Sequence, residues 1–235
     1  MIEKEGGLFM DLVSAMQARH SVRKYTDQAI EPAQAQLLEA RMEEINQQEG
    51  LNFRLILGED QFFQRRIPSF GNFENVKNYF VLAGKKDLDP QKVGYWGEDL
   101  VLYAQSLGLN TCWVGFAKFF YKDLVLDPGQ KVFCLISLGY GQDQGKSRPS
   151  KSLEDVARGP KPYPEWFIQG VQGALLAPTA MNQQKFTIHY HPDGEVDFKA
   201  GRGFFAKLDL GIVKYHFDLV TKDRGCQKKW KNASF

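Results

Sequence analysis

The chain has few cysteines, no long apolar run and almost no net charge. Cys112, Cys134 and Cys226 are odd in number and show no C-x-x-C spacing, which argues against a disulfide framework or a zinc site. No window approaches the roughly 18 consecutive apolar residues of a membrane-spanning helix. Thirty basic and 28 acidic side chains leave a net charge of +2, too balanced for a protein that works mainly on nucleic acid. We therefore expect a globular protein with reduced thiols, no metal ligands, no membrane span and no nucleic-acid partner.

The first residues also lack the pattern of a targeting signal. Two glutamates lie within Met1–Gly7, and the apolar stretch that follows, Leu8–Met10, is too short for the core of a signal peptide. Together with the reduced thiols, this pattern predicts a cytoplasmic location.

The length of 235 residues lies between one and two domains at roughly 150 residues each, so an internal duplication has to be considered. Apolar residues follow helical spacing in some segments and alternate in others, which predicts a mixed α and β protein. Helices are expected at Met10–Gln17, from Glu31-Pro32 through Met42, and at Trp96–Leu107, Trp166–Leu176 and Leu208–Leu219, and strands at Leu51–Leu57, Asn78–Ala83, Lys131–Leu138 and Lys185–His191.

The predicted order of helix, strand and helix occurs twice. A polar region rich in glycine, proline, lysine and serine, Gly141–Tyr163, separates the two occurrences. The tripeptide Asn-Gln-Gln recurs at Asn46–Gln48 and Asn182–Gln184, each between a predicted helix and a predicted strand. This pattern predicts two related halves, residues 1–157 and a truncated 158–235, that together form one compact unit.

The two halves carry different candidate binding residues. Arg19, Ser21 and Arg23 alternate along an N-terminal segment, and guanidinium groups bind phosphate oxygens in bidentate pairs. A second basic cluster, Lys146-Ser147-Arg148, follows a predicted strand. By spacing alone, each cluster is either a phosphate site or a solvated surface patch.

The second half instead has small residues, Ala177–Ala180, at the place where the first half has the charged Arg41–Glu44. Small residues allow a flat ligand to approach the backbone. Since each half lacks what the other has, we expect one composite site rather than two.

Four motifs extend over most of the chain, from about Met10 to Leu219. They are Arg19-His20-Ser21-x-Arg23, then Gly108-Leu109-x-Thr111-x-x-Val114-Gly115 after the helix Gly97–Leu107, Leu138-Gly139-Tyr140 leading to Lys146-Ser147-Arg148, and Pro178-Thr179-Ala180-Met181-Asn182-Gln183-Gln184. Together they resemble the FMN-dependent nitroreductase family.

The resemblance implies an α+β fold with mixed and antiparallel sheets flanked by helices. Members of the family are usually homodimers that bind FMN at the subunit interface. In ordinary members the Pro-Ser-x-x-Asn segment follows the arginine segment by a few tens of residues, whereas here its match begins at Pro178. The chain is therefore similar to a subgroup in which two subunit-like halves are fused, an internal pseudo-dimer. A monomer could then form one complete site, and a homodimer like that of other family members is the alternative.

The resemblance also implies the cofactor contacts. The FMN phosphate and ribityl chain would be held by Arg19, Ser21, Arg23, Lys146 and Arg148, the N5 edge of the flavin would meet the backbone of Val114 and Gly115, and Pro178, Thr179, Ala180 and Asn182 would lie along the isoalloxazine ring. His20 lies inside the arginine cluster. Its side chain either contacts the cofactor or packs at the end of the helix. No catalytic side chain is expected, because FMN supplies the hydride chemistry.

The implied activity is that of an FMN-dependent NAD(P)H oxidoreductase. In the family's ping-pong cycle, NADH or NADPH reduces FMN, leaves, and is replaced by a nitroaromatic or quinone-like acceptor. The chain departs from the family at Lys185-Phe186, where Pro-Trp is frequent. This departure motivates an alternative function, a flavin-binding carrier or sensor without substantial turnover.

Overall fold

The structure is a computed structural model that describes residues 10–66, 72–116 and 126–222. Cys226 and the segments Met1–Gly7 and Leu8–Met10, apart from Met10 itself, lie outside these residues. The chain divides into two compact units. Unit one is Met1–Leu88 with Leu100–Ser147, and unit two is Asp89–Asp99 with Arg148–Phe235. This division follows contacts and does not test whether the chain arose by duplication. The two related halves, residues 1–157 and 158–235, therefore stay a prediction.

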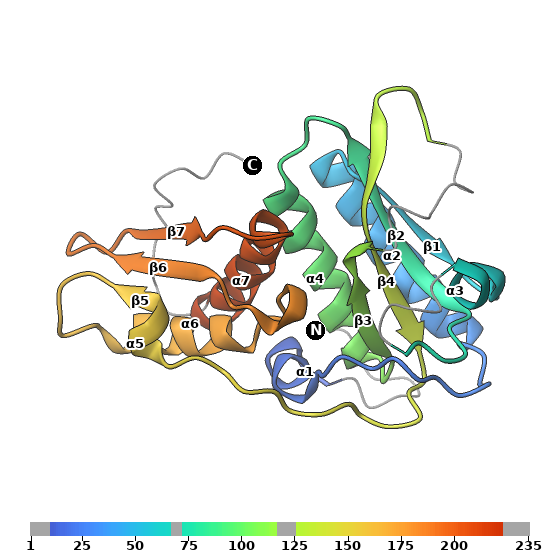
Figure 1. The fold of residues 1–235 in the computed structure, drawn as a ribbon, viewed down its shortest axis with the longest axis horizontal. Helices are drawn as coiled ribbons and strands as arrows, with labels where there is room; N and C mark the ends of the chain where they lie inside the picture. Colours follow the sequence, from blue (N-terminus) through green and yellow to red (C-terminus); the bar gives the residue numbers. More distant parts are fainter. Residues whose placement is uncertain (1–9, 67–71, 117–125, 223–235) are drawn as a thin grey trace. The chain divides into compact units, whose positions relative to one another are not determined.

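Unit one contains a four-stranded antiparallel sheet with the order β1-β2-β4-β3 (Figure 1). The strands are β1 (Asn52–Ile56), β2 (Asn78–Lys85), β3 (Asn110–Val114) and β4 (Gln130–Gly139). The two strands expected in the interior, β2 and β4, are the central pair of the sheet. Their near-continuous apolar sequences match this position, because both faces of a central strand are covered.

Among the described helices of unit one, α1 (Leu12–Ala18) begins and α2 (Pro32–Glu49) ends at residues that favour helix termini. The others are α3 (Gln61–Arg66) and the later part of α4 (Pro90–Ser106). Asp11 caps α1 by accepting the N–H groups of Val13 and Ser14, and Gly50 ends α2 at a φ of 64°.

Two expectations about these helices need correction. The helix α2 continues to Glu49, so the tripeptide Asn46–Gln48 lies within it and not after it. No glycine or proline interrupts the sequence between Pro32 and Gly50, and straight-chain residues such as glutamate and glutamine continue a helix readily. The helix α4 begins at Pro90 rather than at Trp96, since proline suits a first helical position.

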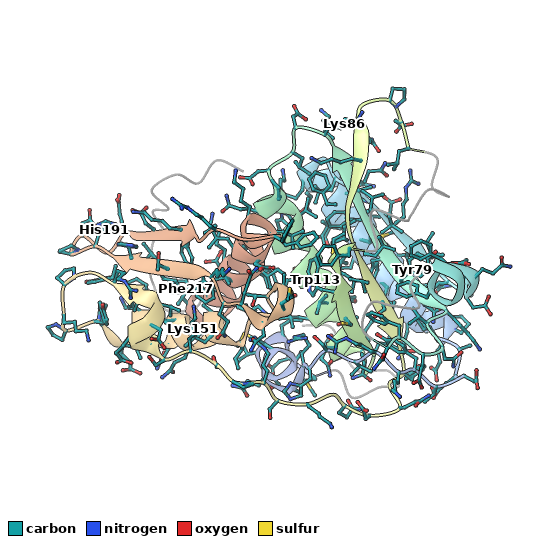
Figure 2. All side chains as sticks on the ribbon, viewed as in Figure 1. Tyr79, Lys86, Trp113, Lys151, His191 and Phe217 are labelled. Atoms are coloured by element: carbon teal, nitrogen blue, oxygen red, sulfur yellow. The ribbon has the colours of Figure 1, made fainter. Side chains whose placement is uncertain are left out.

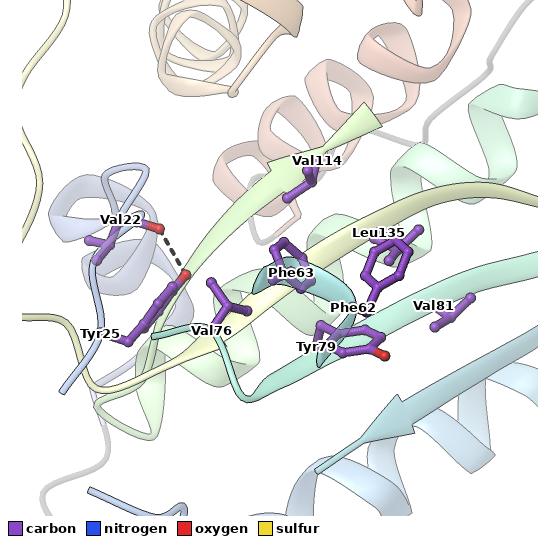
Figure 3. Packing of buried hydrophobic residues seen from close by; sticks show 9 residues of the cluster. All are labelled: Val22, Tyr25, Phe62, Phe63, Val76, Tyr79, Val81, Val114 and Leu135. Atoms are coloured by element: carbon purple, nitrogen blue, oxygen red, sulfur yellow. Dashed lines mark hydrogen bonds between the residues drawn. The ribbon is translucent and has the colours of Figure 1, made fainter. Parts of the chain in front are cut away.

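One face of the sheet in unit one carries a cluster of apolar side chains (Figure 3). Strand residues Tyr79, Val81, Val114 and Leu135 pack there against Phe62 and Phe63 of α3 and against Val22, Tyr25 and Val76. Phe63 and Tyr79 rings lie 5.3 Å apart. The cluster buries two residues of the N-terminal segment that carries the arginines, so it determines the position of that segment.

Unit two contains a three-stranded sheet with the order β5-β6-β7, in which β5 is parallel and β7 antiparallel to β6. Figure 1 shows this sheet beside the helices α6 and α7. The elements are α5 (Leu153–Val156), β5 (Ala157–Arg158), α6 (Glu165–Leu176), the short 3-10 helix η2 (Ala180–Asn182), β6 (Phe186–Tyr190), β7 (Val196–Ala200) and α7 (Ala206–Thr221).

The helix α7 is buried on almost every side. Phe217 of α7, labelled in Figure 2, packs against Phe198 of β7, with ring centroids 5.2 Å apart. Gly211 of α7 and Gly94 of α4 lie where the two helices come closest, since an added Cβ at Gly211 would be 1.9 Å from the carbonyl oxygen of Gln91. A helix that is buried around most of its circumference, as α7 is, is typical of a core position. None of the helices in the described part of the chain is long and apolar enough to cross a membrane.

Candidate functional site

The arginine segment of unit one follows α1 in an extended conformation. Arg19 ends the helix by donating its backbone N–H to the Ala15 carbonyl. The chain then runs beside β3, where Ser21 pairs with Thr111 and the N–H of Val22 donates to the Thr111 carbonyl at 3.0 Å. The segment is therefore an additional short edge of the sheet, and its side chains alternate as the sequence predicts.

Two buried residues anchor this segment. Val22 and Tyr25 are 1% and 2% exposed. The Tyr25 hydroxyl donates to the Val22 carbonyl at 2.8 Å (Figure 3) and lies 2.7 Å from Ser137 Oγ on β4. Burial raises the pKa of Tyr25 well above its ordinary value, so the phenol stays neutral and keeps its proton for these contacts.

Arg19, Ser21 and Arg23 all influence the pKa of the Cys112 thiol on β3. Burial raises the pKa of this thiol, while the charge of Arg23, a hydrogen bond with Ser21 and the charge of Arg19 act in the opposite direction. The three residues therefore belong to one short segment that runs beside β3. Arg19 is buried and Arg23 is exposed. The structure brings together these three predicted residues, and their role toward a cofactor stays a prediction.

Lys146 and His20 lie beside this group in the same unit. Gly145 has a φ of 75°, and an added Cβ would lie 2.6 Å from His20 Cβ and 3.1 Å from the Ser21 carbonyl oxygen. Only glycine permits so close an approach in this left-handed conformation. The exposed Lys146 follows directly, so its backbone lies close to the arginine segment.

Val114 and Gly115 lie at the end of β3. The Val114 side chain is buried in the apolar cluster, so of this residue only the backbone remains for a ligand. Gly115 is half-buried, and Phe116 is the last residue of this described segment. This arrangement suits the backbone contact that the resemblance implies, which stays a prediction.

In unit two, the predicted residues Pro178, Thr179, Ala180 and Asn182 belong to a turn between α6 and β6. We call the residues from Thr179 to Gln184 the polar turn. Thr179 Oγ1 accepts the N–H of Gln184 at 3.0 Å, which closes the turn on itself. The backbone is left-handed at Met181 and Asn182, with φ of 53° and 52°, an uncommon conformation for residues with side chains.

Arg148 and Asn182 contact each other. The Arg148 guanidinium donates to Asn182 Oδ1, and also to the carbonyl oxygens of Leu176 and Ala177 at 3.0 and 2.6 Å. Asn182 Nδ2 donates to the Pro149 carbonyl at 2.9 Å. Both side chains thus bind protein groups at the end of α6. Their contact with a cofactor stays a prediction.

Asp209, in the first part of α7, was missed by the sequence analysis. Its carboxylate accepts the N–H of Ala180 at 3.1 Å and the side-chain amide of Gln183 at 2.9 Å. Asp209 is only 6% exposed. The sequence does contain a signal for it, an acidic residue between Leu208 and Leu210 in an otherwise apolar helical stretch, because a buried carboxylate needs partners.

The stability of the chain should depend on the protonation of Asp209. Burial raises the pKa of this carboxyl from 3.8 to about 6. The folded chain then binds the proton more tightly than the unfolded chain, so the stabilisation is complete below about pH 4 and is lost as the pH rises through about 6. This one carboxyl should therefore change the free energy of unfolding by about 3 kcal/mol over this pH range.

Urea unfolding of the wild type and of Asp209→Asn between about pH 4 and pH 7 measures this dependence. The difference between the two free energies of unfolding should shift with rising pH in favour of the variant, which has no carboxyl to titrate. Parallel pH profiles would contradict the expectation.

Comparison with known proteins supports the architecture. The family model described as "Putative TM nitroreductase" matches residues 11–221. A structure from Thermotoga maritima, titled a "putative nitroreductase", shares 21% identity at a TM-score of 0.63 and is matched over 92% of this chain and 86% of its own. No curated protein matches the chain.

Two further structures are similar over part of the chain. A "putative nitroreductase" from Desulfovibrio desulfuricans, solved in complex with FMN, shares 21% identity at a TM-score of 0.53 and is matched over 65% of this chain and 98% of its own. Nitroreductase A from Vibrio parahaemolyticus shares 14% identity at a TM-score of 0.51, with 62% of this chain and 73% of its own covered. At such identities the likeness shows the α+β fold. Because the family model extends over most of the sequence, from residue 11 to 221, this chain belongs to that nitroreductase family.

Proposed function

We propose that the chain is an FMN-dependent NAD(P)H oxidoreductase that reduces nitroaromatic or quinone-like acceptors. The observation that carries the proposal is the extended segment with Arg19, Ser21 and Arg23, which pairs with β3 through Ser21 and Thr111, in a member of a nitroreductase family. The related structure from Desulfovibrio desulfuricans, which was solved with FMN, supports the choice of cofactor.

The donor set of unit one fits a phosphate monoester. Two guanidinium groups, a hydroxyl and the ammonium of Lys146 offer hydrogen-bond donors to an anion. The close packing of Gly145 on His20 and Ser21 holds the lysine turn against the arginine segment. The buried anchors Val22 and Tyr25 keep the segment extended, so the donors are ordered before an anion arrives.

The polar turn of unit two keeps the role that the resemblance gives it, a contact along an isoalloxazine ring. Ala180 of the turn is half-buried and has a small side chain, which allows a flat ligand to approach there. FMN held by these residues would supply the hydride chemistry between NADH or NADPH and the acceptor, in the ping-pong order that we propose. The chain's own residues hold the phosphate and shape the ring's surroundings, and none is required as a general acid or base.

The absorption spectrum of the purified protein tests the proposal directly. A flavin spectrum, either as purified or after incubation with FMN and removal of the excess, is expected. A preparation that remains colourless after this treatment would overturn it. Anaerobic mixing with NADPH or NADH then separates an enzyme, in which bound flavin bleaches quickly, from a carrier or sensor, in which it does not.

Arg23→Ala should weaken FMN binding, because it removes one charge-assisted contact with the phosphate. The expected loss is roughly 1.5 to 3 kcal/mol, or roughly a 10- to 150-fold rise in Kd. Fluorescence titration with FMN measures the Kd, and the difference from wild type should shrink at higher salt.

The matched control is Arg54→Ala, which removes an exposed arginine from β1. This variant should bind FMN like the wild type. An unchanged Kd in Arg23→Ala would show that the phosphate is held elsewhere.

A further inference from the structure

The polar turn of unit two is held in a conformation that its own sequence does not favour. Met181, Asn182 and Gln184 have φ of 53°, 52° and 41°. None is glycine, and such conformations persist only where the surrounding structure determines them. The turn therefore depends on groups outside itself.

Asp209 holds the turn from the side of α7. Both carboxylate oxygens lie 3.1 Å from the N–H of Ala180, and Oδ2 also accepts the side-chain amide of Gln183 at 2.9 Å. The same Gln183 amide donates to the Phe204 carbonyl at 2.9 Å. One buried carboxylate thus binds two residues of the turn at the base of a buried helix.

Arg148 and Lys151 hold the turn from the other side. Arg148 donates to Asn182 Oδ1 and to carbonyls at the end of α6. Lys151, labelled in Figure 2, donates its backbone N–H to Gln184 Oε1 and its ammonium to the Gln184 carbonyl, both at 2.8 Å. Basic groups therefore meet the acceptors of the turn, and the acidic group meets its donors.

The burial of Asp209 is not explained by a capping role in its own helix. It does not cap its own helix, since α7 has no side-chain cap at Phe205. Burial of a carboxylate is costly unless its partners are fixed, and burial here raises the pKa of Asp209 to about 6. The residue therefore makes a contribution that its own helix does not require.

We propose that Asp209 is a positioning residue that holds the polar turn in the shape that contacts the flavin ring. The proposal rests on the proposed function, because it assigns the purpose of this shape to FMN binding. Asp209 does not itself contact the cofactor in this proposal. It acts through the N–H of Ala180 and the amide of Gln183.

The test compares FMN affinity and the visible circular dichroism of bound FMN in Asp209→Ala, Asp209→Asn and the wild type. The alanine variant should raise the Kd roughly ten-fold or more and change the dichroism, because the ring meets a displaced turn. The asparagine variant keeps an oxygen acceptor for Ala180 and should recover part of the affinity. Lys207→Ala, which alters an exposed residue of the same helix, should match the wild type.

Wild-type Kd and dichroism in Asp209→Ala would overturn the proposal, as would an equal loss in Lys207→Ala. If Asp209→Ala does not fold, Gln183→Met replaces it, because it removes one partner of the carboxylate at a half-buried position. Gln183→Met should then raise the Kd for FMN, and an unchanged Kd would overturn the proposal.

Hydrogen exchange separates a failure of this proposal from a failure of the proposed function. In the FMN-free chain, the amides of Ala180–Gln184 should exchange faster in Asp209→Ala, or in Gln183→Met, than in the wild type. If the wild type binds no FMN, the proposed function fails and the flavin role of Asp209 fails with it. If the wild type binds FMN but exchange in the turn does not change, only the positioning role fails.

Discussion

Glu98→Ala is expected to lower the free energy of unfolding by roughly 3 to 5 kcal/mol, because it leaves His216 buried without its partner. Both side chains are fully buried, and His216 Nε2 lies 2.8 Å from Glu98 Oε1. The other ring nitrogen, Nδ1, lies 3.2 Å from the Gly173 carbonyl oxygen. Since a carbonyl only accepts, Nδ1 carries a hydrogen. One hydrogen lies between Nε2 and the Glu98 carboxyl group, so both ring nitrogens are hydrogen-bonded.

Urea unfolding followed by tryptophan fluorescence measures this loss, and three variants define its origin. Glu98→Gln keeps an acceptor oxygen and should lose less. The double variant Glu98→Met with His216→Leu should lie near the wild type, because it removes both buried polar partners together. Glu165→Ala removes an exposed acid of α6 and should change stability by less than about 0.5 kcal/mol. A loss below about 1 kcal/mol in Glu98→Ala would show that the pair is not a buried ion pair.

Gly211→Ala should destabilise the chain by roughly 3 kcal/mol or more, because the new methyl group meets backbone and not a movable side chain. The Cβ would lie 1.9 Å from the Gln91 carbonyl oxygen and 2.8 Å from the Tyr95 nitrogen on α4. Helix propensity alone would favour alanine over glycine by about 1 kcal/mol, so a net loss identifies the contact between the helices. Asp209 lies two residues away, so FMN affinity should fall as well.

Gly173→Ala on α6 is the graded control for this substitution. Its nearest obstacle is the side chain of Val220, at 2.6 Å, which has more freedom to move than a backbone carbonyl. The loss should therefore be smaller than that of Gly211→Ala. If both variants unfold at the same urea concentration as the wild type, the close approach of α4 and α7 is not what holds unit two together.

The regular elements were predictable where periodicity and end signals agree. α2 has proline at its first position and a left-handed Gly50 after its last, and α4 ends before Gly108, whose φ is 82°, as predicted. The strand β7 was not predicted. Its sequence Val196–Ala200 offers only two large apolar residues in alternation, and pairing with β6 is what makes it a strand.

The candidate site was predictable to a different extent in each unit. The grouping of Arg19, Ser21 and Arg23 follows from alternation, because an extended segment places every second residue on one side. The partners of Arg148 and the role of Asp209 did not follow. They depend on where the end of α6 and the start of α7 meet the polar turn, which no local pattern contains.

The sequence by itself determined the mixed α and β composition, the central strands β2 and β4, and the basic segment that ends α1. These features depend on contacts within a few residues or on a short period of apolar side chains. The tertiary structure alone decided that a buried Asp209 holds a left-handed turn, and that Gly94 and Gly211 let α4 and α7 come together. The reason is physical, since hydrogen bonds and close approaches between residues far apart in the chain exist only once the helices have packed.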